Sequence, residues 1–137
     1  MVEVKLAWAG EMKFTAESES GAGMVFDTGI KYGGSGDHVT PMETVAMALA
    51  SCSGMDLVLI LKKMRVDLRK LDIKVDARRR EKEPSYFEDI KMTFTASGDG
   101  LTKEQLEKAM KLSVDKYCSV GVMLRDKVTI TYEGIVE

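Results

Sequence analysis

Apolar residues occupy almost every position between residues 45 and 61, inside a helix-length segment that runs from residue 40 to residue 64. Thr40 is a preferred helix N-cap, Pro41 suits the first helical position, and Glu43 completes a capping box with Thr40. A helix that is apolar on nearly every side cannot lie on a surface with one face in water. The pattern therefore predicts a core helix, enclosed by sheets, by other helices or by a partner chain.

Polar and small residues interrupt the centre of this helix: Ser51, Cys52, Ser53, Gly54 and Asp56. A membrane-spanning helix needs roughly 20 apolar residues in a row, so the interruption makes a membrane span a minor alternative. Small side chains around Cys52 would let another backbone or a small ligand approach its thiol closely. We expect no membrane partner.

Alternating apolar and polar residues predict short strands elsewhere in the chain. The expected strands cover residues 2–8, 12–17, 24–26, 71–77, 90–96 and 128–132. A turn dense in mixed charge, residues 78–84, joins the fourth strand to the fifth. Because acidic residues stand beside the basic ones in that turn, we interpret it as a solvated hairpin tip rather than a phosphate-binding patch.

A second helix is expected after the glycine-rich break that ends the fifth strand. Thr102 and Gln105 match another capping box, and apolar residues recur at helical spacing from residue 106 to residue 117, which indicates one buried face. We expect this helix to end near Cys118, with Gly121 as a break.

The predicted order of elements is β-β-β-α-β-β-α-β. Strands that come in hairpins, rather than alternating singly with helices, indicate an α+β protein with mostly antiparallel sheets around the long buried helix. A chain of 137 residues is long enough for one domain over residues 1–137 with its own core. Short strands and one further helix would leave part of the apolar helix wet, which suggests that a second subunit completes its burial in a homodimer.

Composition excludes several classes of protein. Hydrophobic residues make up 45% of the chain and charged residues 31%, with a formal net charge of −2. This balance indicates neither a disordered tail nor a nucleic-acid-binding protein. The first residues lack the basic start and apolar run of a secretory signal, and two cysteines far apart in sequence do not form a secreted disulfide framework. The expected location is the cytoplasm.

Cys52 and Cys118 are the two cysteines and the main candidates for chemistry. A free cysteine is often buried and inert, but each of these has serine and small residues beside it and lies on or just after a predicted helix. A zinc site made from both cysteines and His38 would lack a fourth ligand and the usual ligand spacing. We therefore expect no metal, and His38 is more simply a loop residue.

A reactive thiol has to be held as a thiolate by a nearby cation, a hydrogen-bond donor or a helix N-terminus. Cys52 lies about three turns into its helix, beyond useful reach of the helix dipole, so a cationic side chain would be needed. The candidates are few: Lys5, Lys13 and Lys31 in the N-terminal part, and Arg125 after the second cysteine.

Two motifs carry a family resemblance. The sequence TPME at residues 40–43 leads to ASC at residues 50–52 on the apolar helix, and KYCSV at residues 116–120 follows the second helix. With the order of elements, these motifs make the chain similar to the family of osmotically inducible protein C (OsmC) and organic hydroperoxide resistance protein (Ohr), in its Ser/Thr-Pro-Met-Glu branch. The resemblance implies an intertwined dimer with two long central helices between sheets, and reduction of organic hydroperoxides in oxidative-stress defence.

By this resemblance Cys52 would be the peroxidatic cysteine, which attacks the peroxide and becomes a sulfenic acid. Cys118 would be the resolving cysteine, which condenses with that sulfenic acid to a disulfide. A dithiol, in the family often a lipoylated protein, would then reduce the disulfide. No cofactor is implied.

Two positions differ from the peroxidases of the family. Those enzymes have a glutamate ten positions before the reactive cysteine and an arginine in the N-terminal hairpin region, where this chain has Met42 and only Lys13. Glu43 would lie across an ideal helix from Cys52, so a capping role is favoured over a catalytic one. A second function therefore stays open, that of a non-enzymatic stress protein or a protein that binds a small apolar ligand.

Overall fold

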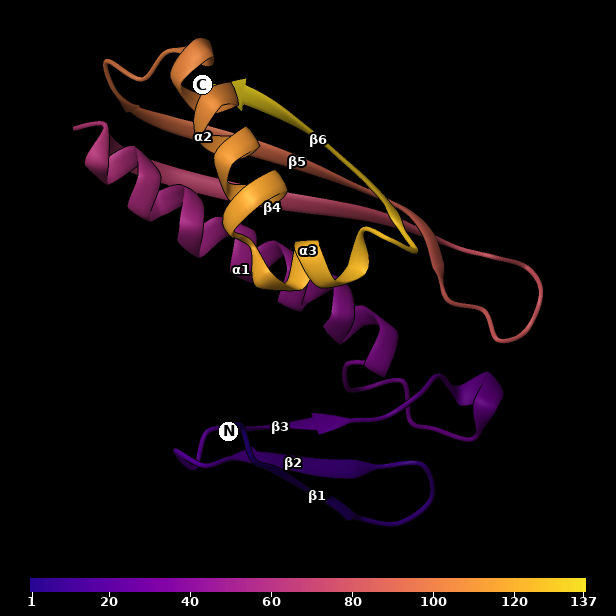
Figure 1. Cartoon of the computed structure of the whole chain (residues 1–137). Coiled ribbons are helices and arrows are strands. Elements are labelled where there is room, and N and C mark those ends of the chain that lie inside the picture. Colours follow the sequence, from indigo (N-terminus) through magenta and orange to yellow (C-terminus); the bar gives the residue numbers. More distant parts are fainter. The chain divides into compact units, whose positions relative to one another are not determined.

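The computed structural model describes residues 1–137, which form two compact units, Met1–Val45 and Ala46–Glu137. The first unit holds strands β1 (Val4–Trp8), β2 (Phe14–Ser18) and β3 (Gly23–Phe26), a short 3₁₀ turn η1 (Ile30–Tyr32) and the first turn of helix α1 (Pro41–Lys63). The second holds the rest of α1, strands β4 (Asp67–Arg79), β5 (Phe87–Asp99) and β6 (Thr129–Val136), and helices α2 (Lys103–Leu112), η2 (Ser113–Tyr117) and α3 (Ser119–Leu124) (Figure 1). The α+β class is confirmed, and the expectation of a single domain stays a prediction.

The first unit is a three-stranded antiparallel sheet in the order β1-β2-β3. Alternation places the large apolar residues of β1 on one face of the sheet, as predicted. Within this unit that face is exposed, with Leu6 at 56% and Trp8 at 67% of their full accessibility. An uncovered apolar sheet face of this kind is typical of a surface that another element or chain covers.

Asp27 organises the loop that leads from β3 to α1. Its buried carboxylate accepts hydrogen bonds from the Ser35 hydroxyl at 2.6 Å and from the backbone N–H groups of Thr28 and Ser35 at 2.7 and 3.2 Å. These donors, the Ser35 hydroxyl first, hold the pKa of the carboxyl below its ordinary value. Gly34 is required beside it, since a Cβ there would lie 2.0 Å from the Thr28 carbonyl oxygen.

The second unit is a sheet in the order β4-β5-β6 with helices on its apolar face. The predicted alternation is confirmed, because Ile90, Met92 and Phe94 of β5 are buried while Lys91 between them is exposed. Both long helices touch this face. A Cβ on Gly54 of α1 would lie 2.8 Å from Ile73 Cδ1 of β4. A Cβ on Gly134 of β6 would lie about as close to side chains of α2.

Strand β6 pairs parallel to β5, so this sheet is mixed, while the other strand pairs are antiparallel and the expectation of mostly antiparallel sheets is confirmed. The reason for the parallel pair is the long connection through α2, η2 and α3. Such a crossover carries the chain back to the end of the sheet at which β5 began, whereas a hairpin would start the next strand beside the point where β5 ended.

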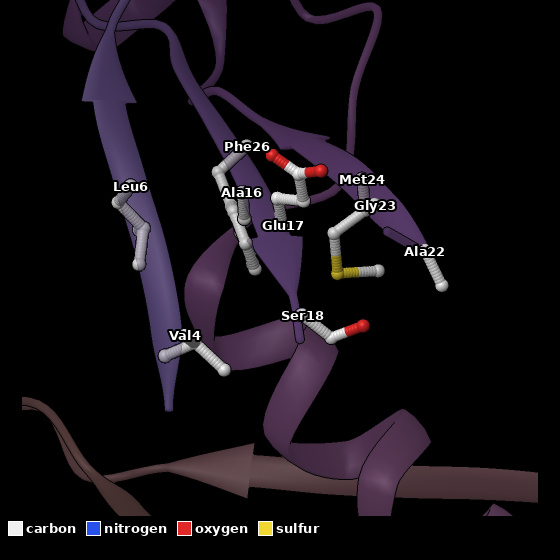
Figure 2. A pocket seen from close by; sticks show the side chains of 9 residues that line it. All are labelled: Val4, Leu6, Ala16, Glu17, Ser18, Ala22, Gly23, Met24 and Phe26. Carbon is white, nitrogen blue, oxygen red and sulfur yellow. The ribbon is translucent and has the colours of Figure 1, made fainter. Parts of the chain in front are cut away.

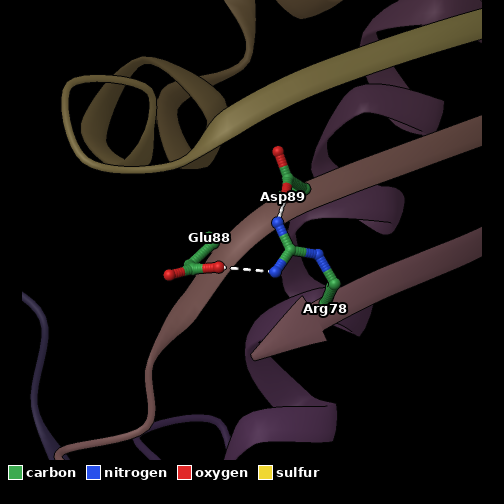
Figure 3. A network of polar contacts seen from close by, with 3 residues as sticks. All are labelled: Arg78, Glu88 and Asp89. Carbon is green, nitrogen blue, oxygen red and sulfur yellow. Dashed lines mark hydrogen bonds and ion pairs between the residues drawn. The ribbon is translucent and has the colours of Figure 1, made fainter. Parts of the chain in front are cut away.

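The strands of the long hairpin also extend further than predicted. Arg78 and Arg79, assigned to the turn from the sequence, belong to β4. The Arg78 guanidinium donates to Glu88 at 2.6 Å and to Asp89 across the strand pair (Figure 3). These acids raise the pKa of Arg78, with Asp89 contributing most. At such an exposed site solvent screens ion pairs strongly, so these pairs help to fix the strand register more than they stabilise the fold.

Helix α1 begins as predicted: the Thr40 hydroxyl accepts from the Glu43 N–H at 3.2 Å, and the Glu43 carboxylate accepts from the Thr40 N–H at 3.0 Å. The expected burial on all sides is not found in the single chain. One stripe is buried, namely Leu49, Ser53, Gly54, Leu57 and Leu61. The opposite side is exposed, with Met55 at 69% and Leu59 at 58%. By length and composition alone α1 could also cross a bilayer, a property it shares with core helices of soluble proteins.

The second helical region is three helices rather than one. The predicted capping box of Thr102 and Gln105 starts α2. The backbone then widens into the π-helical turn η2, in which the Cys118 N–H donates to the Ser113 carbonyl at 2.7 Å, and α3 follows. The sequence predicts a helix break at Gly121. In the structure Gly121 instead lies buried within α3.

Candidate functional site

Cys118 lies in a buried polar cluster between η2 and α3. Its side chain has 0% of its accessibility left. The Ser53 hydroxyl from α1 and the Gly121 N–H each donate to Cys118 Sγ at 3.3 Å. The thiol itself faces the Leu49 carbonyl oxygen at 4.0 Å. Cys118 therefore sits among fixed donors from α1 and α3 rather than in a purely apolar core.

Glycine at position 121 makes this arrangement possible. A Cβ there would lie 3.3 Å from the Val114 carbonyl oxygen and 3.4 Å from Cys118 Sγ, which is closer than most real contacts. Without a side chain, the Gly121 N–H can approach the sulfur directly. The glycine that the sequence suggests as a helix break is instead needed for close packing around Cys118.

Ser53 is itself held in place. Its side chain is fully buried, and its carbonyl oxygen accepts a hydrogen bond of 2.6 Å from the buried Ser113 hydroxyl. This bond joins the middle of α1 to the start of η2. Helix α1 itself carries the Ser53 hydroxyl to within 3.3 Å of Cys118 Sγ.

Cys52 stands next to Ser53 in the middle of α1, partly exposed, and both cysteines are free thiols. The Cys52 side chain lies within interaction distance of Cys118 and is one of the groups that affect its titration. The structure thus brings together two residues that are 66 positions apart in the sequence. Their roles stay a prediction.

Burial raises the pKa of the Cys118 thiol above its ordinary value. The hydrogen bonds from Ser53 and Gly121 oppose this rise, and the neighbouring Cys52 adds to it. Burial is the largest effect, so Cys118 stays a protonated thiol at neutral pH.

Arg125, the cation expected near the second cysteine, is bonded elsewhere. Its guanidinium donates to the Asp115 carbonyl oxygen at 2.5 Å. The Asp115 carboxylate accepts from the Tyr132 hydroxyl at 3.0 Å. Burial and this carboxylate raise the pKa of Tyr132 to about 12. The strongest donors recorded around Cys118 are therefore neutral.

The remaining candidates belong to the first unit. Glu43 is exposed and occupied in the capping box with Thr40, the arrangement favoured from the sequence. His38 is an exposed loop residue. Lys31 lies over the ring of Tyr32 at 5.6 Å, and Lys13 lies near enough to Asp27 to lower the pKa of that carboxyl. Within neither unit do three metal-binding side chains form a cluster.

The first unit also carries a shallow apolar hollow of about 440 Å³ over the face of its sheet (Figure 2). Its lining comes from the three strands and the turn before β3: Val4, Leu6, Ala16, Glu17, Ser18, Ala22, Gly23, Met24 and Phe26. Apolar side chains dominate and Glu17 is the single charged residue.

Comparison with known proteins decides the family. Residues 34–133 match the family described as OsmC-like protein. This chain is an OsmC-like protein. It is 37% identical to protein YhfA of Escherichia coli strain K12 over 132 residues, which cover 96% of this chain and 95% of YhfA. The resemblance seen in the two cysteine motifs is therefore confirmed for the family, while the branch stays a prediction.

Solved structures share the OsmC-like fold. A hypothetical protein from Aquifex aeolicus VF5 superposes with a TM-score of 0.88 at 31% identity, over 100% of this chain and 96% of its own. An organic hydroperoxide resistance protein OsmC from Legionella pneumophila superposes with a TM-score of 0.74 at 14% identity, over 98% and 96% of the two chains. The second likeness concerns the fold.

Sequence reasoning found both cysteines of this OsmC-like chain but not the residues that contact Cys118. Ser53 and Gly121 stand among the small residues near the two cysteines, and Ser113 lies within the predicted second helix. Ser53 and Cys118 are 65 positions apart. No local pattern links residues at that distance, so only the fold shows the contact.

Proposed function

We propose that this OsmC-like protein is a two-cysteine peroxidase that reduces organic hydroperoxides in defence against oxidative stress. The observation that supports the proposal is the pairing of free Cys52 and Cys118 in one cluster, one thiol partly exposed and the other buried. The family and the name of the Legionella relative agree with it.

The reaction has two steps within the protein. The Cys52 thiolate attacks the terminal oxygen of the hydroperoxide, the O–O bond breaks, and an alcohol leaves while Cys52 becomes a sulfenic acid. The Cys118 thiol then attacks the Cys52 sulfur, and the hydroxyl group of the sulfenic acid leaves as water. The result is a disulfide, with the two electrons transferred to the peroxide.

The different surroundings of the two thiols suit these roles. Partial exposure gives Cys52 access to peroxide, whereas a buried, protonated Cys118 is protected from direct oxidation. The cycle closes with a dithiol reductant, for which a lipoylated protein is our candidate partner. We place the activity in the cytoplasm, where thiols are kept reduced.

The test is turnover. With cumene hydroperoxide and dihydrolipoamide, the wild-type protein should consume both at equal rates while the Cys52 thiol is lost and regained in each cycle. Ser51→Ala is the matched control, since this exposed hydroxyl bonds only to the Ala48 carbonyl and should leave turnover unchanged. Ligand retention without any thiol oxidation would reject the peroxidase.

We further propose that the working unit is a homodimer. Met55 and Leu59 of α1 are 69% and 58% exposed in the single chain, and the β1-β2-β3 face is also uncovered. Apolar surfaces of this kind are usually buried by a partner.

Two leucines of α1, two positions apart, test the homodimer. Leu57→Asp puts a charge at a fully buried position, where its cost exceeds the stability of a small domain, so this variant should not fold. Leu59→Asp alters an exposed position and should leave circular dichroism intact but yield monomers in sedimentation at micromolar concentration. Wild-type protein that sediments as a monomer would contradict the dimer.

A second function is favoured by the hollow over the β1-β2-β3 face and by Met42 at the position of the family glutamate. Its apolar lining suits a small apolar ligand. Native mass spectrometry of purified protein decides between the two functions. A retained ligand together with thiols that resist peroxide would support the binding protein.

A further inference from the structure

The Ser53 hydroxyl and the Gly121 N–H converge on one sulfur atom. Both donate to Cys118 Sγ at 3.3 Å, from α1 and from the start of α3. Ser53 is fully buried, as is Cys118. Two fixed donors on a buried sulfur are more than a resolving thiol needs, because a neutral thiol is only a weak acceptor.

Such donors matter most when the sulfur carries negative charge. In the second half of the cycle a reductant thiolate attacks one sulfur of the disulfide, and the other sulfur leaves with the bonding electron pair as a thiolate. The leaving sulfur departs faster when its thiolate is more stable. Hydrogen bonds to a charged sulfur are roughly twice as strong as those to a neutral one.

We propose that Ser53 directs the reduction step, by stabilising Cys118 as the leaving thiolate so that the reductant joins to Cys52. This inference rests on the proposed two-cysteine cycle. In this step the reductant S–Cys52 Sγ bond forms and the Cys52 Sγ–Cys118 Sγ bond breaks. A second reductant thiolate then attacks the reductant sulfur of that mixed disulfide and releases Cys52, so two thiols are oxidised to one disulfide overall.

Access favours the same direction. Cys52 is partly exposed on α1, whereas Cys118 is closed off by Ser53, Gly121 and the Leu49 carbonyl. An incoming dithiol therefore reaches the Cys52 sulfur first. The titratable group that faces Cys118 is Cys52 itself, which is neutral while it is bonded to the reductant. The charge that develops on Cys118 is thus met by Ser53 and Gly121 alone.

Ser113 provides a matched control for Ser53. Its hydroxyl is equally buried and belongs to the same cluster, but it donates to the Ser53 carbonyl oxygen and not to the sulfur. Ser113→Ala and Ser53→Ala each remove one buried hydroxyl. Only Ser53→Ala removes a donor to Cys118, so a purely structural role would affect both variants alike.

The experiment uses diamide to oxidise the full-length protein, so that the disulfide forms without any peroxidase activity. Excess dithiothreitol is then added and the release of thiols is followed. Losing a hydrogen bond to a charged group changes a rate about tenfold or more. The disulfide of Ser53→Ala should therefore be reduced about tenfold more slowly than that of the wild type, and the disulfide of Ser113→Ala at a rate within about twofold of the wild type. With limiting glutathione and rapid alkylation, peptide mapping of the wild type should find the mixed disulfide on Cys52.

A second readout does not depend on the disulfide. In the Cys52→Ser background, thiolate absorbance reports the titration of Cys118 alone, and adding Ser53→Ala should raise its midpoint by about one pH unit while Ser113→Ala leaves it in place. Equal reduction rates for wild type and Ser53→Ala, glutathione on Cys118, or no disulfide with diamide would overturn the inference. If the wild type showed no turnover with peroxide while the disulfide of Ser53→Ala was still reduced slowly, only the proposed peroxidase activity would be rejected.

Discussion

The two thiols of this protein are neighbours with opposite surroundings. Cys118 is fully buried and accepts hydrogen bonds from Ser53 and Gly121, and burial raises its pKa. Cys52, one residue before Ser53 on α1, is partly exposed and lies beside Cys118. The contrast arises because one turn of α1 directs consecutive side chains about 100° apart, one to the buried stripe and the other toward its edge.

This contrast indicates a division of labour rather than duplication. A thiol that meets the oxidant needs access, whereas a thiol that must wait for an intermediate needs protection. The protein supplies both within one cluster. The donors on Cys118 then serve the later step in which that sulfur is released.

The largest expected effect comes from replacing each of the two cysteines by serine in turn. Cys52→Ser should abolish peroxide consumption, because the attacking sulfur is gone, and Cys118 should stay reduced. Cys118→Ser should keep the first oxidation and leave a sulfenic acid on Cys52, which excess peroxide oxidises further. Dimedone labelling followed by mass spectrometry distinguishes the two variants.

The outcome that would break the comparison is equal dimedone labelling of both variants, since the two sulfurs would then be interchangeable. No labelling of either variant would favour the ligand-binding function. Melting temperatures of both variants should be measured alongside, so that loss of labelling is not confused with loss of folding.

A smaller effect concerns the stability of the cluster around Cys118. Ser113→Ala removes a buried hydrogen bond of 2.6 Å to the Ser53 carbonyl and should lower the free energy of unfolding by about 1–3 kcal/mol. Ser51→Ala, on the exposed side of α1, should change it by less than about 0.5 kcal/mol. Urea denaturation measures both. If both variants lost a similar amount of unfolding free energy, the buried and the exposed side of α1 would contribute equally to stability.

Next in size is the cap of α1, which tests whether Glu43 belongs with the thiols. Thr40→Ala should cost about 1 kcal/mol of stability, because it removes the acceptor for the Glu43 N–H. Glu43→Gln keeps an acceptor for the Thr40 N–H and should be milder. If Glu43→Gln removed thiol reactivity while leaving the melting temperature unchanged, Glu43 would be catalytic and the cap interpretation would be wrong.

The smallest effect appears only in alkaline solution. Cys118 binds its proton more tightly in the folded protein than in the unfolded chain, and Tyr132 does so up to a pKa of about 12. Their contribution to stability is therefore complete below the unfolded pKa values of 9.0 and 10.0, and it is lost as the pH rises through the folded values.

Thermal melting under reducing conditions, at neutral pH and at about pH 11, checks this expectation. The alkaline drop in melting temperature should be smaller in Cys118→Ala and in Tyr132→Phe than in the wild type. A drop of the same size in both variants would mean that neither group retains its proton as the structure indicates.

Local patterns predicted most elements of the fold and both capping boxes. Thr40 and Thr102 were found because an N-cap depends on residues three positions apart. The parallel direction of β6 was missed because alternation along a strand does not indicate which way the strand runs. The length of chain between β5 and β6, too great for a hairpin, was the signal that could have shown it.

The cysteines were also predicted, but not their surroundings. Gly121 looked like a helix break because glycine is a poor helix former, whereas its missing side chain is what lets α3 pack against Val114 and Cys118. Ser53 carried no signal of its contact with Cys118, since the two residues are 65 positions apart. Contacts made by packing, rather than by periodicity, are what the sequence could not reveal.

The most direct test of the account is the mass of the intact, reduced protein before and after one equivalent of an organic hydroperoxide. The account predicts a loss of two hydrogens, and peptide mapping should place the new disulfide between Cys52 and Cys118. An unchanged mass, or a gain of oxygen with both thiols unlinked, would contradict it.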